Sequence, residues 1–219
     1  MADSTPPALL HAIRGEAERL QRPLQEAQAQ RLGQLLQLLA HWAQRIRLTG
    51  SADAVALVRR HLADALMLAA ALPVQPEQRC LDVGSGGGLP ALPTAVLRPE
   101  LGITLVEPQQ RKCAFLRTAI HALALDGCRV LQQRLEQTTL PLVHVAWSLA
   151  TFAPEEWLRR ALPLLLPGGL VVAFVVRPEV VAAPPRGLVL CATQRYTLAD
   201  ETPRALLLFR RQEQADAGN

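Results

Sequence analysis

One stretch restricts the fold of this 219-residue chain more than any other: Leu81-Asp82-Val83-Gly84-Ser85-Gly86-Gly87-Gly88-Leu89-Pro90-Ala91-Leu92-Pro93. An apolar run that ends in an acid meets alternate glycines and then a proline-opened helix, the pattern of a strand, a tight turn and a helix start. The glycines permit a sharp turn and let a ligand approach the backbone, because no Cβ intervenes. A helix start carries unpaired N–H groups and a partial positive charge. The stretch therefore predicts a binding site for an anionic or hydroxyl-rich ligand.

Beyond residue 79 short apolar runs alternate with helical segments. Continuous apolar strands with helices between them are typical of a parallel sheet covered on both faces, so we predict an α/β fold with a doubly wound, mainly parallel sheet. Strands are expected at Cys80–Val83, Ile103–Val106, Arg129–Leu131, Val143–Trp147 and Leu170–Val176, and helices at Leu92–Leu97, Gln109–Leu125 and Glu155–Leu165. Two more strands, Leu188–Gln194 and Ala205–Arg210, have no convincing helix after them and predict a closing β-hairpin.

The first third of the chain has a helical pattern from Pro7 to about Leu72. Its apolar residues recur at three- and four-residue steps and form one stripe, and a second helix is expected to begin near Asp53. We therefore divide the chain into an N-terminal helical region packed on the core (1–76), a sheet domain (77–211) and a polar tail (212–219).

The composition says more about the cellular compartment of the protein than about its binding partner. The net charge of +4 and the pI near 9.3 are compatible with nucleic-acid binding but do not require it. The four cysteines form no C-x-x-C pair and do not cluster with histidines, which indicates a reducing compartment and no metal site. The N-terminus does not resemble a signal peptide, and no uncharged run is long enough for a membrane span. We expect a soluble, cytoplasmic monomer without a membrane partner.

The glycine spacing distinguishes two cofactor classes. A dinucleotide site favours G-x-G-x-x-G, whereas this loop has G-x-G-x-G and places Leu89 at the sixth position. S-adenosylmethionine has no phosphate, needs a smaller cradle and is therefore favoured. Glu107 ends the next strand, where a carboxylate can accept hydrogen bonds from both ribose hydroxyls of either cofactor.

Other polar residues have two interpretations each. His61 and Asp64 share a helix face, either as a catalytic pair or, as we favour, as a buried polar pair that ties the helix to the sheet domain. Five basic residues form a phosphate-binding patch if they meet on one face and are otherwise a solvated surface: Arg59, Arg60, Arg111, Lys112 and Arg117.

Further motifs complete a family pattern. They are Thr104-Leu105-Val106-Glu107, Arg111-Lys112-x-x-Phe115-Leu116-Arg117, Trp42 followed by Leu48-Thr49, Arg60-His61-Leu62-x-Asp64-x-Leu66, and Arg134-Leu135-Glu136. Together with the glycine loop, they make residues 30–176 resemble the RsmG/GidB family of 16S rRNA guanine-N7 methyltransferases.

The resemblance implies a class I, Rossmann-like methyltransferase fold with an N-terminal helical extension, so that 77–211 is the methyltransferase domain. It implies S-adenosylmethionine as the donor and 16S rRNA, free or in the small ribosomal subunit, as the partner. The catalytic residues stay unknown, and the basic residues named above are the candidate RNA-binding set. Candidate cofactor-binding residues are Gly84, Ser85, Gly86, Gly88, Leu89, Glu107, Leu135, Glu136 and Leu149.

The chain departs from the family pattern mainly where substrate contacts are expected. The family's Ser-Arg-Ala is Ser148-Leu149-Ala150, which exchanges a five-donor cation for an aliphatic side chain, and its Leu-Lys-Gly is Phe174-Val175-Val176, with Arg177 displaced. Smaller changes replace Asn-Leu-Thr by Arg47-Leu48-Thr49, Asp-Ser-Leu by Asp64-Ala65-Leu66 and Pro-Gly-Ile-Pro by Pro90-Ala91-Leu92-Pro93.

Three functions stay open at this stage. The leading hypothesis is S-adenosylmethionine-dependent methyl transfer to N7 of a guanine in 16S rRNA. The second is a catalytically impaired relative that binds S-adenosylmethionine or RNA without methyl transfer, which the departures at Leu149 and Val175 motivate. The third and weaker one is a nicotinamide-dependent oxidoreductase, because Glu107 also suits that cofactor's ribose.

Overall fold

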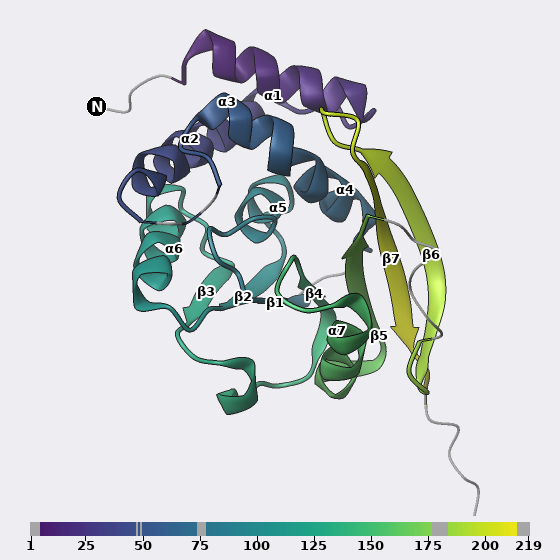
Figure 1. Ribbon diagram of the computed structural model, residues 1–219. Coiled ribbons are helices and arrows are strands. Elements are labelled where there is room, and N and C mark those ends of the chain that lie inside the picture. The colour runs from purple at the N-terminus through teal and green to yellow at the C-terminus, as the bar shows by residue number, and fades with distance from the viewer. Residues whose placement is uncertain (1–4, 47, 49, 74–77, 177–183, 214–219) are drawn as a thin grey trace, which may run out of the picture.

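Figure 1 shows the computed structural model, which describes residues 5–46, 48, 50–73, 78–176 and 184–213. The strands are β1 (Arg79–Val83), β2 (Gly102–Val106), β3 (Cys128–Leu131), β4 (Val143–Ser148), β5 (Leu165–Val175), β6 (Leu188–Thr197) and β7 (Pro203–Arg211). The α-helices are α1 (Pro7–Arg19), α2 (Glu26–Ala43), α3 (Ala54–Leu57), α4 (Ala63–Ala71), α5 (Ala91–Leu97), α6 (Gln110–Ala122) and α7 (Pro154–Ala161). A π-helical turn η1 (Val58–Leu62) joins α3 to α4, and short 3-10 turns lie at η2 (Leu135–Gln137) and η3 (Leu162–Leu164).

The sheet has the strand order β3-β2-β1-β4-β5-β7-β6. Strands β1 to β5 pair in parallel, whereas β7 pairs antiparallel with both β5 and β6. The predicted doubly wound sheet with a closing hairpin is therefore confirmed. The order of the strands reverses at β1: β2 and β3 lie on one side of it, and β4 and β5 lie on the other. In α/β folds, ligands bind at the carboxyl ends of the strands beside such a switch point.

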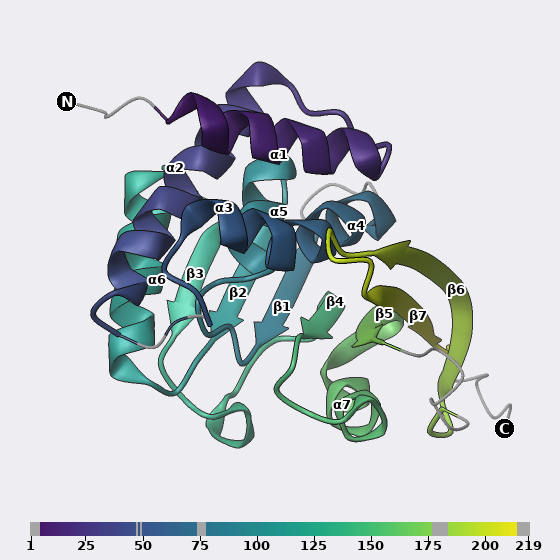
Figure 2. The same cartoon turned by 45° about the horizontal axis from the view of Figure 1, so that its top comes forward.

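Two hydrophobic cores lie on the two faces of the sheet, because successive strand residues point to opposite sides. Cys80 and Ile103 face the larger core, under α1 to α6, whereas Leu81 and Val106 face the smaller one, under α7. Figure 1 and Figure 2 show this division, with α7 on the opposite side of the sheet from α1 to α6.

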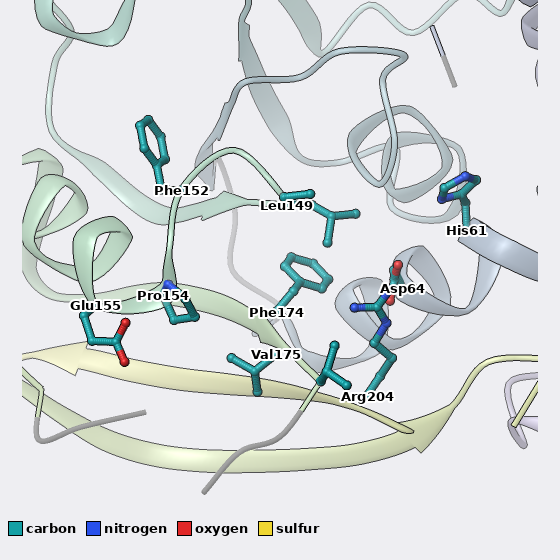
Figure 3. Close-up of a pocket in the computed structure, with 11 residues that line it drawn as sticks. His61, Asp64, Leu149, Phe152, Pro154, Glu155, Phe174, Val175 and Arg204 are labelled. Atoms are coloured by element: carbon teal, nitrogen blue, oxygen red, sulfur yellow. The ribbon is translucent and has the colours of Figure 1, made fainter. Parts of the chain in front are cut away.

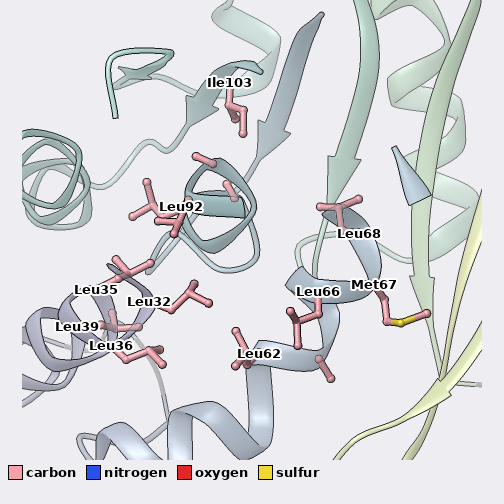
Figure 4. Packing of buried hydrophobic residues seen from close by; sticks show 14 of the residues in the cluster. Leu32, Leu35, Leu36, Leu39, Leu62, Leu66, Met67, Leu68, Leu92 and Ile103 are labelled. Atoms are coloured by element: carbon pink, nitrogen blue, oxygen red, sulfur yellow. The ribbon is translucent and has the colours of Figure 1, made fainter. Parts of the chain in front are cut away.

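The predicted apolar stripe of α2 is core. Leu32, Leu35, Leu36 and Leu39 are buried, and Figure 4 shows Leu32 and Leu35 on the side of α2 towards Leu92 of α5. The N-terminal helices thus pack on the sheet through the helix that follows the glycine loop. In the described part of the chain, no helix is both long enough and apolar enough to cross a membrane.

Element boundaries differ from the prediction where proline intervenes. The helix expected to reach Leu165 ends at Ala161, because Pro163 has no N–H to continue it. The chain passes through η3 and enters β5 at Leu165, before the expected Leu170, and a register shift lies between Val143 and Val145 of the neighbouring strand. The predictions at Arg47, Thr49, Pro76 and Arg177, and at most of the tail, fall outside the described residues.

Candidate functional site

The glycine loop has the conformation that its sequence predicts. Gly84, Gly86 and Gly88 all have positive φ, at 74°, 54° and 76°, a region that residues with a Cβ rarely adopt. The N–H groups of Gly84 and Ser85 both donate to the Val106 carbonyl, at 2.9 and 3.2 Å. The loop is therefore fixed to the end of β2.

The space around each glycine explains why a side chain is absent there. A Cβ on Gly84 would lie 2.2 Å from Thr151 Oγ1, and one on Gly88 would lie 2.4 Å from Leu92 Cδ1. At Gly86 the nearest atom to such a Cβ would be the Gly84 oxygen, 3.8 Å away. Gly84 and Gly88 thus permit close packing within the protein, whereas Gly86 borders open space that a ligand can fill.

Glu107 lies directly against this loop. Its Oε2 accepts a hydrogen bond from the Gly86 N–H and its Oε1 accepts one from the Gln109 N–H, each at 2.9 Å. The side chain is buried, at 3% exposure. A carboxylate has about four acceptor positions, so two remain for hydroxyl groups of a ligand beside Gly86.

Asp82 is a site residue that the sequence analysis did not select. It is buried at the carboxyl end of β1, and its Oδ2 has no hydrogen-bond partner. Its pKa is raised to about 7, mainly by burial and in smaller part by the nearby Glu107 carboxylate. An acid that ends an apolar strand immediately before a glycine loop was the available signal.

A cavity of about 480 Å³ opens beyond the ends of β4 and β5 (Figure 3). Its apolar wall consists of Leu149, Ala150, Phe152, Pro154, Phe174, Val175 and Val176, and its polar lining of His61, Asp64, Glu155 and Arg204. We call it the base cavity. The loop that carries Leu149 and Phe152 also carries Thr151, which packs on Gly84. The glycine loop and the base cavity therefore share one wall.

Tyr196 connects the base cavity to the hairpin. Asp64 is buried, and its Oδ1 accepts a hydrogen bond from the Tyr196 hydroxyl at 2.5 Å. The predicted tie between this helix and the sheet domain is thus present, but it runs through Asp64 and β6. Burial raises the pKa of Asp64, and the Tyr196 hydrogen bond and the Arg204 charge partly oppose that effect.

Two arginines act on His61 of the base cavity. Burial lowers the pKa of His61, and the positive charges of Arg60 and Arg204 lower it further. Both effects favour the neutral imidazole. In Figure 3 Arg204 extends from β7 towards Asp64, on the side of the cavity where Leu149 and Phe174 lie. Tertiary structure brings this guanidinium to the cavity from the end of the chain.

Leu135 and Glu136 lie on η2, beside α7. Leu135 is half-buried against the smaller core. Glu136 is exposed and pairs with Arg160, which also binds Glu156 at 2.8 Å. In this structure the Glu136 carboxylate is thus engaged with α7, and its proposed cofactor role stays a prediction. Leu89 is half-buried against the larger core, and Leu149 lines the base cavity.

The candidate RNA-binding residues lie on two different elements. Arg59 and Arg60 are exposed on η1, whereas Arg111, Lys112 and Arg117 lie on α6. Helix α2 contacts both α6 and α3, the helix that leads into η1. Of the five, Arg60 is the residue whose charge acts on His61 at the base cavity. Among the described residues, no group of three His, Cys, Asp or Glu side chains could hold a metal ion.

Topology and site together define a class. A structure described as an S-adenosylmethionine-dependent methyltransferase from Aquifex aeolicus has the same fold, with a TM-score of 0.53 and 13% identity over 71% of this chain and 93% of that one. Thermus thermophilus TrmN matches with a TM-score of 0.53 and 26% identity, over 68% of this chain and 47% of that one. The protein has the class I, Rossmann-like methyltransferase fold.

Sequence comparison identifies the family within that class. The family described as rRNA small subunit methyltransferase G (GidB) matches residues 28–178. Proteins named ribosomal RNA small subunit methyltransferase G are 42% identical in Acidiphilium cryptum, over 61% of each chain, and 35% identical in Chloroflexus aggregans, over 85% of this chain and 83% of that one. The chain belongs to the GidB family, and the predicted resemblance is confirmed.

Proposed function

We propose that the protein transfers a methyl group from S-adenosylmethionine to N7 of a guanine in 16S rRNA of the small ribosomal subunit. The observation that carries the proposal is the wall shared by the glycine loop and the base cavity, through Thr151 and Gly84. A methyltransferase must hold donor and acceptor in contact, and a cavity beside a cofactor loop meets that requirement. Family membership supplies the substrate class.

The chain's own residues fit the proposed donor. Gly86 borders open space, Glu107 keeps acceptor positions for ribose hydroxyls, and the unpartnered Asp82 oxygen lies under the loop. When bound, S-adenosylmethionine supplies a methyl group on a positively charged sulfur. The buried Glu107 carboxylate beside the loop favours a cationic ligand.

The acceptor chemistry needs no general base. Guanine N7 has a free lone pair at neutral pH, so the protein mainly aligns the base, an effect that can lower a barrier by about 7–11 kcal/mol. The apolar wall that includes Leu149 and Phe174 suits a flat aromatic ring, whereas Asp64, Glu155 and Arg204 provide polar groups that orient it. Arg204 also supplies a guanidinium to the cavity in which Leu149 replaces the family arginine.

The test is methyl transfer to a defined acceptor. Small subunits from a bacterium that lacks this methylation are incubated with the protein and methyl-labelled S-adenosylmethionine, and the rRNA is digested and analysed by mass spectrometry. We expect 7-methylguanosine. Glu107→Gln should weaken cofactor binding at least tenfold by calorimetry, the effect of losing hydrogen bonds to a charged acceptor. Glu18→Gln, at an exposed position on α1, is the matched control.

The same assay separates the alternatives. Cofactor binding without transfer, with activity appearing in Leu149→Arg, would support the impaired relative that Leu149 motivates. Binding of a nicotinamide cofactor in place of S-adenosylmethionine would contradict the proposal. Label in a nucleoside other than 7-methylguanosine would keep the methyltransferase class and overturn the N7 assignment.

A further inference from the structure

A second cavity, of about 630 Å³, lies between the end of α1 and the β6–β7 hairpin. Arg19 closes one side. Its guanidinium donates to the Thr197 hydroxyl at 3.0 Å and to the Thr197 carbonyl at 2.7 Å, and it pairs with the buried Glu16. Arg19 therefore fastens α1 to β6, and its charge is neutralised within the protein.

The lining of this cavity carries positive charge in excess. Among the described residues, its lining contains three arginines and no aspartate or glutamate, and neither Arg195 nor Arg204 forms an ion pair. Arg195 is exposed, and the buried Nε of Arg204 has no hydrogen-bond partner. We call this the arginine cavity. A concave surface lined by arginines and by no carboxylate among the described residues attracts anions, and guanidinium geometry suits phosphate oxygens.

The arginine cavity and the base cavity are neighbours. Arg204 and Val176 line both. Arg204 is opposite Tyr196 in the antiparallel β6–β7 ladder, and Tyr196 in turn holds Asp64 of the base cavity. Arg195 precedes Tyr196 and lines the arginine cavity from the edge strand β6. An anion bound beside Arg204 would thus lie one side chain away from a ligand in the base cavity.

We propose that the arginine cavity binds the phosphodiester backbone of the RNA strand next to the target guanine. The inference rests on the proposed function for the identity of that base. A strand whose guanine enters the base cavity must continue out of it, and the arginine cavity is the adjoining basic surface. Phosphate contacts of this kind set register and orientation and do not depend on sequence. The α1–hairpin junction is then an RNA-positioning surface, distinct from the α6 basic residues.

The test removes the charge of Arg195, whose side chain forms no ion pair with any residue that the structure describes. Arg195→Gln and Arg195→Glu are compared with Arg159→Gln, which removes an exposed arginine from α7. Three quantities are measured: the S-adenosylmethionine Kd by calorimetry, kcat and KM for small subunits, and the affinity for those subunits at increasing potassium chloride. The first quantity reports whether the fold and the cofactor site are intact.

We expect Arg195→Gln to raise KM for the subunits about threefold to tenfold, with kcat and the cofactor Kd unchanged. The slope of log affinity against log salt should decrease by about 0.7–1 for the lost phosphate contact. Arg195→Glu should have the larger effect, and Arg159→Gln should match the wild type.

Two outcomes separate this inference from the proposed function. Wild-type methyl transfer with no change in KM or salt slope in either Arg195 variant, and with those changes in Arg111→Gln, would overturn the inference and leave the function intact. Subunit binding that depends on Arg195, without any methyl transfer, would support the inference and contradict the proposed function.

Discussion

At the scale of single residues, Gly84 and Thr151 show how the site is assembled. Gly84 lies in the first turn after β1 and Thr151 in the loop after β4, and a Cβ on Gly84 would overlap the Thr151 side chain. The positive φ of Gly84 alone already favours glycine. The close contact adds a second requirement, because it sets the distance between the cofactor loop and the wall of the base cavity.

Asp82 permits a prediction about pH. Burial raises its pKa from 3.8 to about 7, so the folded state favours the neutral carboxyl. Stability from this group is therefore fully present below its unfolded pKa and is lost as pH rises towards 7. At about 1.4 kcal/mol per pKa unit, the loss is on the order of 4 kcal/mol.

Asp82→Asn should remove that dependence. The free energy of unfolding of the variant, measured by urea titration between pH 4 and 8, should fall less with pH than that of the wild type. The variant should be the more stable protein at pH 8. Asp53→Asn, at an exposed helix cap, is a control for carboxylate loss elsewhere. Parallel pH profiles for wild type and Asp82→Asn would contradict the prediction.

At the scale of elements, α4 and β6 are joined by a polar contact inside an apolar interface. The Tyr196 hydroxyl donates to a carboxylate that is 2% exposed. A buried acceptor that loses its donor costs more than the hydrogen bond gains, because its desolvation is no longer compensated. The contact therefore fixes how α4 lies against the hairpin, and with it the position of Asp64 in the base cavity.

Tyr196→Phe should lower the free energy of unfolding by about 2 kcal/mol, because it leaves Asp64 Oδ1 without its donor. Chemical denaturation at pH 7 measures the change. Thr94→Val is the matched control, since the Thr94 hydroxyl is buried and has no hydrogen-bond partner. That variant should be neutral or slightly stabilising, and an equal loss in both variants would show that the Tyr196 contact contributes nothing specific.

At the scale of the whole molecule, the larger core runs without interruption from Leu9 of α1 to Leu208 of β7. We propose on this basis that the helical region 1–76 and the methyltransferase domain 77–211 unfold as one cooperative unit. Arg19 adds a polar connection between the first helix and the last hairpin. A helical region with a separate core would behave as an independent domain.

Ile13→Ala tests this cooperativity. The side chain is fully buried on α1, so its truncation should cost about 2–5 kcal/mol. Unfolding is followed by circular dichroism, which reports helix content, and by tryptophan fluorescence, to which Trp157 of the smaller core contributes. The unfolding midpoint should fall to the same lower value with both probes. His11→Ala, exposed on the same helix, should not move it. Separate midpoints for the two probes would indicate two units.

The sequence by itself determined the fold class, the position of the glycine loop after a strand, and the position of Glu107 at the end of the next strand. These depend on local patterns: strand and helix periodicity, alternate glycines and an acid at a strand end. It could not place Arg204 or Tyr196, because a hairpin residue carries no local signal for what lies across the space between elements. It placed the five candidate basic residues on two helical segments but could not show whether those segments meet on one face, because that depends on how the helices pack.

Only the tertiary structure decided which side chains share a cavity. The β7 strand inserts between β5 and β6, and this brings Arg204 to the cavity lined by Leu149 and Asp64. The same insertion places Arg195 beside α1. Local sequence patterns determine the part of the site proposed to hold the methyl donor, because one strand–loop–helix unit contains most of it. The acceptor side is built from four distant segments, so its composition depends on how the whole sheet closes.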